Sequence, residues 1–363
     1  MGRRDQGAAH PARPRPRGPP RERGPLVTAV ALPVSESRRA LAVRLLAPAA
    51  VVLLLAVFGA SVPGYFAPTN LLNVASAGAL LLIAACAMTL VVRAGGIDLS
   101  IGIAIDLAAL GATALIADGY VTWFAVLIGL GFGTLAGVVN AVLVIVLRIR
   151  AFLATLSVWF IGTSAQQLLT GGGAPIYLRR QATPDAFAAW GNATVLGIGV
   201  PVLLAIAVAV AVWLLLDRTR WGRVLTAAGE QPGATRIAGR RVGISLASAF
   251  VVAALIGALA GIALASRSYG YSPASGQLYV LDAIGAVFIG ATLSAHGRPN
   301  VLGTVLGVLI FGLINNGLVL LGVSFYWQGL VRGSVLLLLL LATALLRRES
   351  IAPPLRTLLT SRR

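Results

Sequence analysis

Long apolar runs alternate with short polar segments along the chain from about residue 45 onward. Ten runs approach the roughly 20 residues of helix that a bilayer crossing requires. The third and the eighth are the least clear, because they contain Asp106 and Asp282. The pattern predicts an all-α, polytopic membrane protein with about ten transmembrane helices. The runs lie near residues 45–62, 74–92, 101–117, 121–147, 151–170, 195–216, 246–265, 280–295, 301–323 and 327–346.

Arginines in the polar segments predict the orientation of these helices. With the N-terminus inside, the cytoplasmic segments contain 25 Arg and the exterior segments contain three. Because basic residues concentrate in cytoplasmic loops, both the N- and C-termini are predicted to be cytoplasmic. One span more or fewer would move the later loops across the membrane and weaken this asymmetry. The cytoplasmic segments are 1–44, 93–100, 148–150, 217–245, 296–300 and 347–363.

The same pattern divides the chain into regions. Residues 1–43 are rich in Arg, Pro and Gly without apolar periodicity, which predicts a disordered, basic cytoplasmic tail. Residues 44–346 form the predicted transmembrane domain, with a long cytoplasmic loop at 217–245, and residues 347–363 form a second basic tail. The many later apolar runs argue against a cleaved signal peptide.

Composition excludes several classes of protein. The chain is 58% hydrophobic and 11% charged, against about 25% charged in soluble domains. Its net charge of +18 results from 29 basic and 11 acidic residues; all the basic residues are Arg, and ten of these Arg precede the first apolar run. This clustering favours contact with anionic lipid over nucleic acid, since no recognition module accompanies it.

Missing residue types argue against catalysis in this chain. Without Lys, the chain lacks the Walker A motif that would bind ATP. One Cys and two His cannot form an internal disulfide, a thiolate cluster or a His-rich metal site. No two acidic residues lie within six positions of each other, so no local pair suggests a lipid-phosphate enzyme. Transport is therefore the favoured activity.

Polar residues inside the apolar runs are candidates for a translocation path, because such residues are costly in a bilayer. They can equally form amide hydrogen bonds between helices. Asp106 and Asp282 also suit an ion-coupled secondary carrier of a small polar solute, or could lie solvated near the ends of their spans. The path candidates are Asp106, Asn140, Gln166, Asn315 and Asn316.

Two polar segments carry further signals. In RAGGIDLSIG (93–102), Gly95 and Gly96 permit a sharp turn, and Asp98 or Ser100 is predicted to cap the next helix. In the 217–245 loop, Gly229 and Pro232 permit a turn before a short helix over 234–238. That helix would suit docking of a soluble partner, and the alternative is a solvated basic loop. Glycines at intervals of four, such as Gly129, Gly133 and Gly137, predict close helix packing.

Four stretches, in chain order, resemble the permease subunits of bacterial ABC importers for ribose and other simple sugars. GGIDLSIG (95–102) is similar to the family signature GGIDLSVG, and RIRAFLATLSVWFIGTSAQQLLTGGGAPI to its R-x-P-x-F-I-A-T-L-G segment and the T-G-G-x-P-I after it. WGRVLTAAGEQPGATRIAG resembles the loop that docks on the ATPase subunit. LDAIGAVFIGATLSAHGRPNVLGTVLGVLIFGLINNGLVLLGV resembles the family's last motif. The resemblance covers residues 45–346.

The resemblance implies a monosaccharide permease of a bacterial cell membrane. It implies a second permease subunit, an extracytoplasmic sugar-binding protein, and cytoplasmic ATPase subunits that hold ATP and Mg²⁺, with no cofactor or metal in this chain. It marks 95–102 as a signature, with Gly95, Gly96, Asp98 and Ser100. Val280, Ala291, His296, Gln231 and Asp106 depart from the family pattern, which bears on the substrate. The docking residues are Gly229, Gln231, Ala234, Arg236, Ala238 and Gly239.

Overall fold

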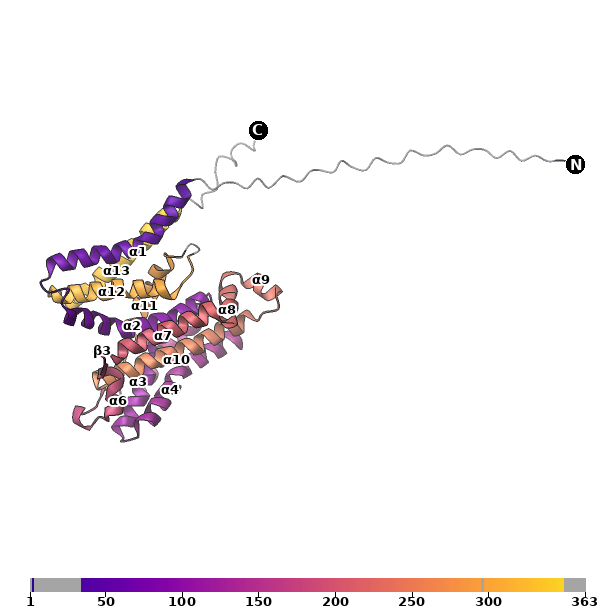
Figure 1. Cartoon of the computed structure of the whole chain (residues 1–363). Coiled ribbons are helices and arrows are strands. Elements are labelled where there is room, and N and C mark those ends of the chain that lie inside the picture. Colours follow the sequence, from indigo (N-terminus) through magenta and orange to yellow (C-terminus); the bar gives the residue numbers. More distant parts are fainter. Residues whose placement is uncertain (1, 3–33, 295–296, 349–363) are drawn as a thin grey trace.

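Ten apolar helices form the bundle in the computed structural model, which describes residues 2, 34–294 and 297–348 (Figure 1). Within these residues, eight helices are long and apolar enough to cross a membrane, and two are shorter. The prediction of an all-α, polytopic membrane protein is confirmed. Most of the two predicted tails and His296 lie outside the described residues.

The long helices match the apolar runs, with α1 starting ahead of its run. They are α1 (Val34–Ser61), α2 (Pro68–Arg93), α4 (Thr122–Ile145), α5 (Ala151–Leu169), α7 (Val200–Arg218), α10 (Val242–Ser268), α12 (Val301–Leu320) and α13 (Phe325–Arg348). The short apolar helices are α3 (Ile101–Ala117) and α11 (Leu278–Ala291). Their carboxylates, Asp106 and Asp282, are the residues that made these two runs unclear in the sequence.

Small elements lie at the two ends of the bundle. The end that the Arg distribution predicts to be exterior carries α6 (Asp185–Asn192), a 3₁₀ turn at Arg180–Ala182, and four short strands that pair as β1 with β4 and β2 with β3. The strands are β1 (Ile176–Tyr177), β2 (Thr194–Val195), β3 (Ile198–Gly199) and β4 (Gly270–Tyr271). The opposite end, which the Arg distribution predicts to be cytoplasmic, carries α8 (Arg220–Glu230) and α9 (Pro232–Ile237), which project to the right in Figure 1. The two ends are named by this predicted orientation below.

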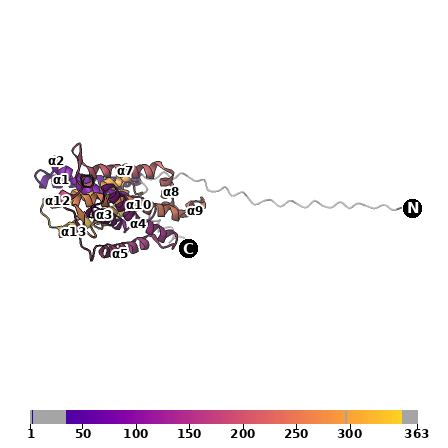
Figure 2. The same cartoon turned by 90° about the horizontal axis from the view of Figure 1, so that it is seen from below.

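The helices are arranged in layers around α2 and α10, the two most buried long helices. On one side α11 and α12 pack against α2, and α1 and α13 cover α12. On the other side α3 and α4 pack against α10, and α5 lies at the edge of the bundle (Figure 2). Burial of α2 and α10 explains why both read as continuous apolar runs without a polar face.

Glycines at intervals of four bring α4 close to its neighbours, as the sequence predicts. A methyl group at any of the three positions would meet a backbone carbonyl of α3 or α10, so these helices pack nearly backbone to backbone. Gly129 faces Ala108, Gly133 faces Ala104 and Gly137 faces Phe250.

The two short helices begin at the same level, in the middle of the bundle. The first carbonyl of α3, on Ile101, lies against Gly257, which is near the centre of α10. Gly102 lies against the backbone of Gln277, the residue before α11. From this meeting point α3 runs towards the exterior end and α11 runs towards the cytoplasmic end. Broken helices that meet inside a bundle are typical of transporter sites.

Candidate functional site

The segment between α2 and α3 runs from the cytoplasmic end into the bundle. Gly95 has a positive φ of 86° and lies against Gly229 of α8. Gly96 then packs beside Val91 and Phe250, and Asp98 and Ser100 are each 1% exposed. The predicted sharp turn is therefore present at Gly95, but the residues after it are buried among helices and do not form a surface loop.

Asp98 and Ser100 bond to each other, and neither side chain caps α3. Asp98 Oδ1 accepts from the Ser100 backbone N–H at 2.8 Å and from its hydroxyl at 2.6 Å. The Ser100 Oγ in turn accepts from the Asn140 amide at 2.6 Å. The predicted cap is wrong because these groups are occupied by a buried network that fixes the segment to α4. Thr155 of α5 adds a bond to the Ile97 carbonyl at 3.2 Å.

Arg93 joins the start of this segment to three cytoplasmic elements. Its Nε donates to Thr226 of α8 at 3.0 Å, and one terminal nitrogen donates to the Pro299 carbonyl at 2.7 Å. The other terminal nitrogen lies 3.2 Å from the Asp217 carboxylate at the end of α7. A second ion pair, between Glu230 and Arg298, joins the end of α8 to the loop before α12. Sequence reasoning placed Arg93 in the cytoplasm but did not reveal these contacts.

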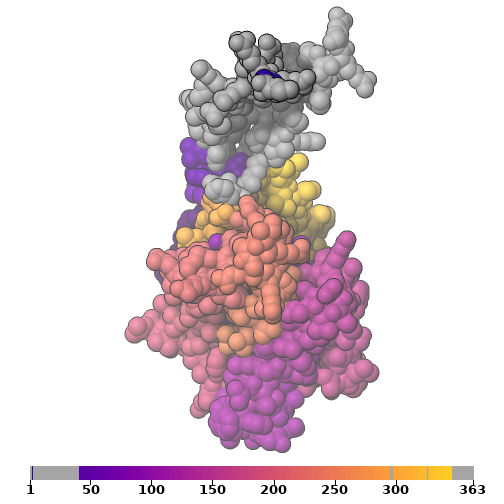
Figure 3. All heavy atoms as spheres, turned by 90° about the vertical axis from the view of Figure 1, so that its right-hand side faces the viewer, coloured from indigo at the N-terminus to yellow at the C-terminus, as the bar shows by residue number. Residues whose placement is uncertain are grey.

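The helices α8 and α9 form a raised feature on the cytoplasmic end, which Figure 3 shows face on. Thr235 ties α9 to α8 through a 2.8 Å bond to the Ala227 carbonyl. The predicted docking residues of α9 and its C-terminal turn are exposed, namely Ala234, Arg236, Ala238 and Gly239. Exposed Gln231 links the helices and lines a groove of about 480 Å³ between them, whereas Gly229 is half-buried against Gly95.

Asp106 and Gln166, two predicted path residues, meet at the loop that leads into α11. Asp106 Oδ1 accepts from the Gly276 N–H at 2.6 Å. Gln166 Oε1 accepts from the Tyr271 hydroxyl at 2.7 Å and from the Ala274 N–H at 3.3 Å. Burial, and then the Asp106 carboxylate, raise the pKa of the Tyr271 phenol, so it donates as a neutral hydroxyl.

The remaining path candidates are placed elsewhere. Asn140 belongs to the Asp98 network described above, and Asn316 of α12 exchanges two hydrogen bonds with Asn70 of α2, at 2.9 and 3.1 Å. Asn315 is half-buried on the same helix. Of the five predicted path residues, only Asp106 and Gln166 therefore lie next to each other across different elements.

An ion pair between Asp282 of α11 and Arg332 of α13 was not anticipated. The signal available in the sequence was one charge of opposite sign in each of two apolar runs, which favours pairing between the two residues. Val280, a departure from the family pattern, packs against Gly102, and Ala291 is buried at the end of α11. In the part of the chain that the structure describes, no three His, Cys, Asp or Glu side chains gather as a metal site.

Sequence comparison shows which known proteins the chain is similar to. Residues 70–340 match a family described as the permease component of branched-chain amino acid transport systems. The ribose import permease RbsC of Escherichia coli K12 is 35% identical over 292 residues, which cover 80% of this chain and 91% of that protein.

Two further relatives cover similar lengths. RbsC of Bacillus subtilis is 34% identical over 77% of this chain and 86% of its own length. The fructose import permease FrcC of Rhizobium meliloti is 32% identical over 81% of this chain and 82% of its own length. No solved structure matches the chain. With most of its length matched in this way, the chain belongs to this family of membrane permease components.

Proposed function

We propose that this permease imports a monosaccharide across the bacterial cell membrane, driven by ATP that a separate cytoplasmic ATPase hydrolyses. The relatives named for ribose and fructose import support a sugar as cargo. The observation that carries the mechanism is the contact between Gly229 of α8 and Gly95, where the chain turns into the bundle. It connects an exposed cytoplasmic feature to the segment that positions α3.

The exposed face of α9 and the groove beside it form the ATPase docking site in this proposal. When ATP closes the ATPase subunits, α8 and α9 move, and Arg93 and Gly95 pass the displacement to α2 and to the 94–100 segment. The Glu230–Arg298 pair passes it to the loop between α11 and α12. Both short helices are thus connected to one docking feature. ATP drives transport because the ATPase binds one conformation more tightly than the other.

The cargo path combines modest polarity with weak binding. A sugar offers hydroxyls and no charge, so amides and a carboxylate can contact it without a deep pocket. Asp106, Asn140, Gln166, Asn315 and Asn316 are the proposed contacts, with a second permease subunit completing the path. A soluble binding protein delivers the sugar at the exterior end, where α6 and the short strands lie. High affinity belongs to that protein, since the permease must release its cargo.

ATP-driven accumulation is the first test. In liposomes that contain this chain with its ATPase and loaded binding protein, we expect D-ribose or D-fructose to accumulate only when ATP is present. Uptake should persist when an uncoupler dissipates the proton gradient, because no ion flow drives it. Accumulation that needs the proton gradient and not ATP would overturn the importer proposal in favour of an ion-coupled carrier.

A charge on α9 is the second test. Ala234→Glu is expected to lower uptake by at least about tenfold, since an unpaired carboxylate in a protein contact costs more than the 1.4 kcal/mol that tenfold represents. ATP hydrolysis by the ATPase should continue without uptake. Ala234→Ser serves as the control, because it adds polarity without charge at the same exposed position. Equal uptake by both variants would place the docking site elsewhere.

A further inference from the structure

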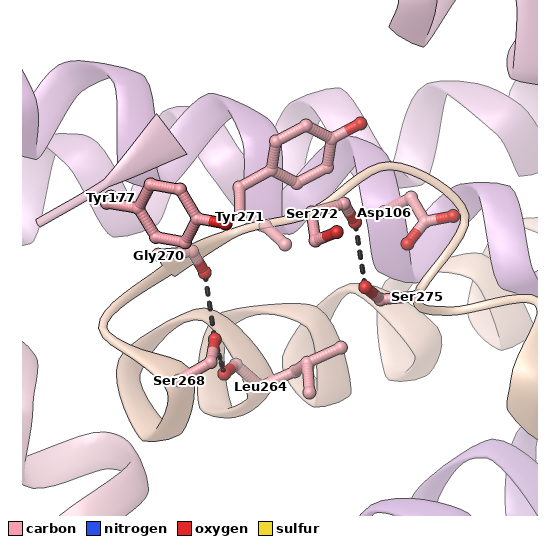
Figure 4. A pocket seen from close by; sticks show the side chains of 9 residues that line it. Asp106, Tyr177, Leu264, Ser268, Gly270, Tyr271, Ser272 and Ser275 are labelled. Atoms are coloured by element: carbon pink, nitrogen blue, oxygen red, sulfur yellow. Dashed lines mark hydrogen bonds between the residues drawn. The ribbon is translucent and has the colours of Figure 1, made fainter. Parts of the chain in front are cut away.

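Two strand pairs lie at the exterior end of the bundle, and they differ in their surroundings. The β1–β4 pair borders a small cavity between α3 and α10, whose wall carries serine hydroxyls and the Asp106 carboxylate (Figure 4). Both residues of β4 are buried. The β2–β3 hairpin instead comes directly before α7 and exposes apolar side chains. The first pair is therefore part of the bundle, whereas the hairpin has a free apolar tip.

The tip of the hairpin combines an apolar side chain with a strained backbone. Leu196 is 97% exposed, and Val195 and Ile198 on either side of the turn are 52% and 38% exposed. Leu196 has a φ of 53°, and Gly197 after it has a φ of 79°. A two-residue turn with positive φ at both positions favours Asn-Gly, because L side chains resist this conformation. A leucine here is unfavourable in water on both counts, which indicates an apolar partner outside the chain.

Contacts along α2 and α7 show the depth of the hairpin in the membrane. At the cytoplasmic end, the Arg93–Asp217 ion pair joins the two helices. At the exterior end, Gly199 of β3 lies against Ser76 of α2, and Arg267 donates to the Ser76 carbonyl at 2.7 Å. Arg93 is 17 positions from Ser76, and Asp217 is 18 positions from Gly199. At 1.5 Å per helical residue, the two levels are about 26 Å apart.

That separation is close to the thickness of the hydrocarbon core, which is about 30 Å. Charged groups mark both levels, namely the Arg93–Asp217 pair at one and Arg267 at the other. Because charges are costly inside the core, these levels correspond to its two boundaries. The hairpin therefore lies in the interfacial layer of the outer leaflet.

The charge distribution at the exterior end favours lipid over protein as the partner of the hairpin. No charged residue occurs between Asp185 and Asp217. The exterior arginines flank the other strand pair, where Arg180 stacks over the Tyr269 ring next to β4. Charged and polar groups steer a soluble protein to its docking site and fix its register. Those groups are found beside β1 and β4, and the hairpin offers only apolar and uncharged contacts.

The backbone of the hairpin and the helix after it also suit a lipid environment. Thr194 pairs with Gly199 and Val195 pairs with Ile198, which lowers the cost of placing this backbone near acyl chains. Below the hairpin, one face of α7 exposes apolar side chains at intervals of four residues to the hydrocarbon core. These side chains are Ile206, Val210 and Leu214.

We propose that the β2–β3 hairpin is a lipid anchor, whose tip residues Val195, Leu196 and Ile198 insert among the phospholipids of the outer leaflet. The anchor fixes the outer end of α7, and α7 leads through Thr219 into α8 at its other end (Figure 1). One consequence rests on the importer function proposed above. When the ATPase moves α8, the anchored end is the fixed point about which α7 tilts.

Quenching by brominated lipid tests the insertion. Leu196→Cys carries the fluorophore NBD, and the native Cys86 is buried and does not take the label. The full chain is placed in phosphatidylcholine nanodiscs with or without bromine on the acyl chains, and iodide serves as the water-soluble quencher. We expect brominated chains to lower the emission by at least about twofold and iodide to have little effect, as for a side chain about 5–10 Å into the boundary between headgroups and acyl chains.

Ile237→Cys is the matched control for this experiment. Ile237 is also apolar and is 91% exposed, but it lies on the cytoplasmic helix α9. Its label should respond to iodide and not to brominated lipid. Ile198→Cys provides a second reporter on the hairpin if the first variant does not fold. Quenching of the hairpin label by iodide and not by brominated lipid overturns the anchor, and if the binding protein then shields the label, the hairpin docks that protein instead.

Two substitutions at Leu196 separate the lipid contact from the fold of the hairpin. Leu196→Asn introduces the Asn-Gly pair that this turn favours, but it removes the apolar tip. Leu196→Trp keeps an apolar side chain of the kind that concentrates at membrane interfaces. With the label at Ile198→Cys, the asparagine variant should lose the quenching by brominated lipid and the tryptophan variant should retain it. Equal quenching in both variants would mean that Leu196 does not hold the hairpin in the lipid.

Sugar uptake per ATP hydrolysed tests the role of the anchor in coupling. Leu196→Asn is expected to lower this ratio by about two- to thirtyfold, the range that mutations of coupling elements span, and Leu196→Trp should preserve it. Lost lipid contact with an unchanged ratio overturns the coupling role and leaves the anchor. Absence of ATP-driven uptake in the wild type overturns the importer function, whereas the quenching measurement, which needs no transport, still decides the anchor.

Discussion

Gly229→Ala is expected to separate ATP hydrolysis from sugar uptake. A methyl group at this position would lie within 3.0 Å of the Arg93 carbonyl oxygen and of backbone atoms of Ala94 and Gly95. Cβ atoms in real structures essentially never come so close to another atom. Because the obstacle is backbone, α8 must move away from the turn at Gly95. Overpacking of this kind costs typically 1–3 kcal/mol. We expect sugar uptake per ATP hydrolysed to fall by about thirtyfold, which corresponds to about 2 kcal/mol.

Gly233→Ala is the matched control for that experiment. Gly233 lies in α9, four residues from Gly229, and a methyl group there meets nothing within 4 Å. Both changes add the same helix-favouring residue, so intrinsic propensity cancels between them. The ratio of transported sugar to released phosphate is measured for each variant in liposomes. A loss of the same size in both variants would mean that α8 and α9 dock the ATPase but that the Gly229–Gly95 contact transmits nothing.

The fold was largely predictable because a bilayer imposes length and polarity on each helix. The apolar runs and the Arg asymmetry predict the helices and the orientation without tertiary information. The bounds of α3 also match its predicted run, 101–117, whereas α11 covers 278–291 where the predicted run was 280–295. What the sequence did not predict is how the residues before α3 are bonded. Ser100 precedes α3 by sequence, but its hydroxyl bonds Asp98 and Asn140, and Asn140 is 40 positions away in the chain. No local rule for caps contains that contact.

The candidate site shows the same division between local and distant information. Asp106 and Gln166 were identifiable as polar residues in apolar runs, which is a property of each residue alone. Their convergence on loop 271–277 depends on contacts between residues more than 100 positions apart. The contacts of Arg93 have the same origin, and the Asp282–Arg332 pair joins residues 50 positions apart. Sequence therefore predicts which residues are costly to bury, and the structure shows which partner offsets each cost.

Asp98→Ala is expected to destabilise the permease more than any other single alanine substitution in the signature segment. The substitution removes the one carboxylate oxygen that accepts from both the N–H and the hydroxyl of Ser100. Each buried donor left unpaired costs about 1–3 kcal/mol, so the two together cost about 2–6 kcal/mol of unfolding free energy. A loss of that size is a large part of a typical stability of 5–15 kcal/mol. The thermal midpoint in nanodiscs, together with the yield of folded protein, measures it.

Asp98→Asn distinguishes the hydrogen bonds from the negative charge. An asparagine can place its carbonyl oxygen where Oδ1 lies, so both bonds from Ser100 are retained while the charge is lost. We therefore expect the asparagine variant to stay within about 1 kcal/mol of the wild type, a typical net value for one hydrogen bond. If both variants instead lose stability equally, the charge is what the segment requires. The N–H groups that begin α3 would then be the reason, since a helix N-terminus stabilises a nearby carboxylate even without a capping bond.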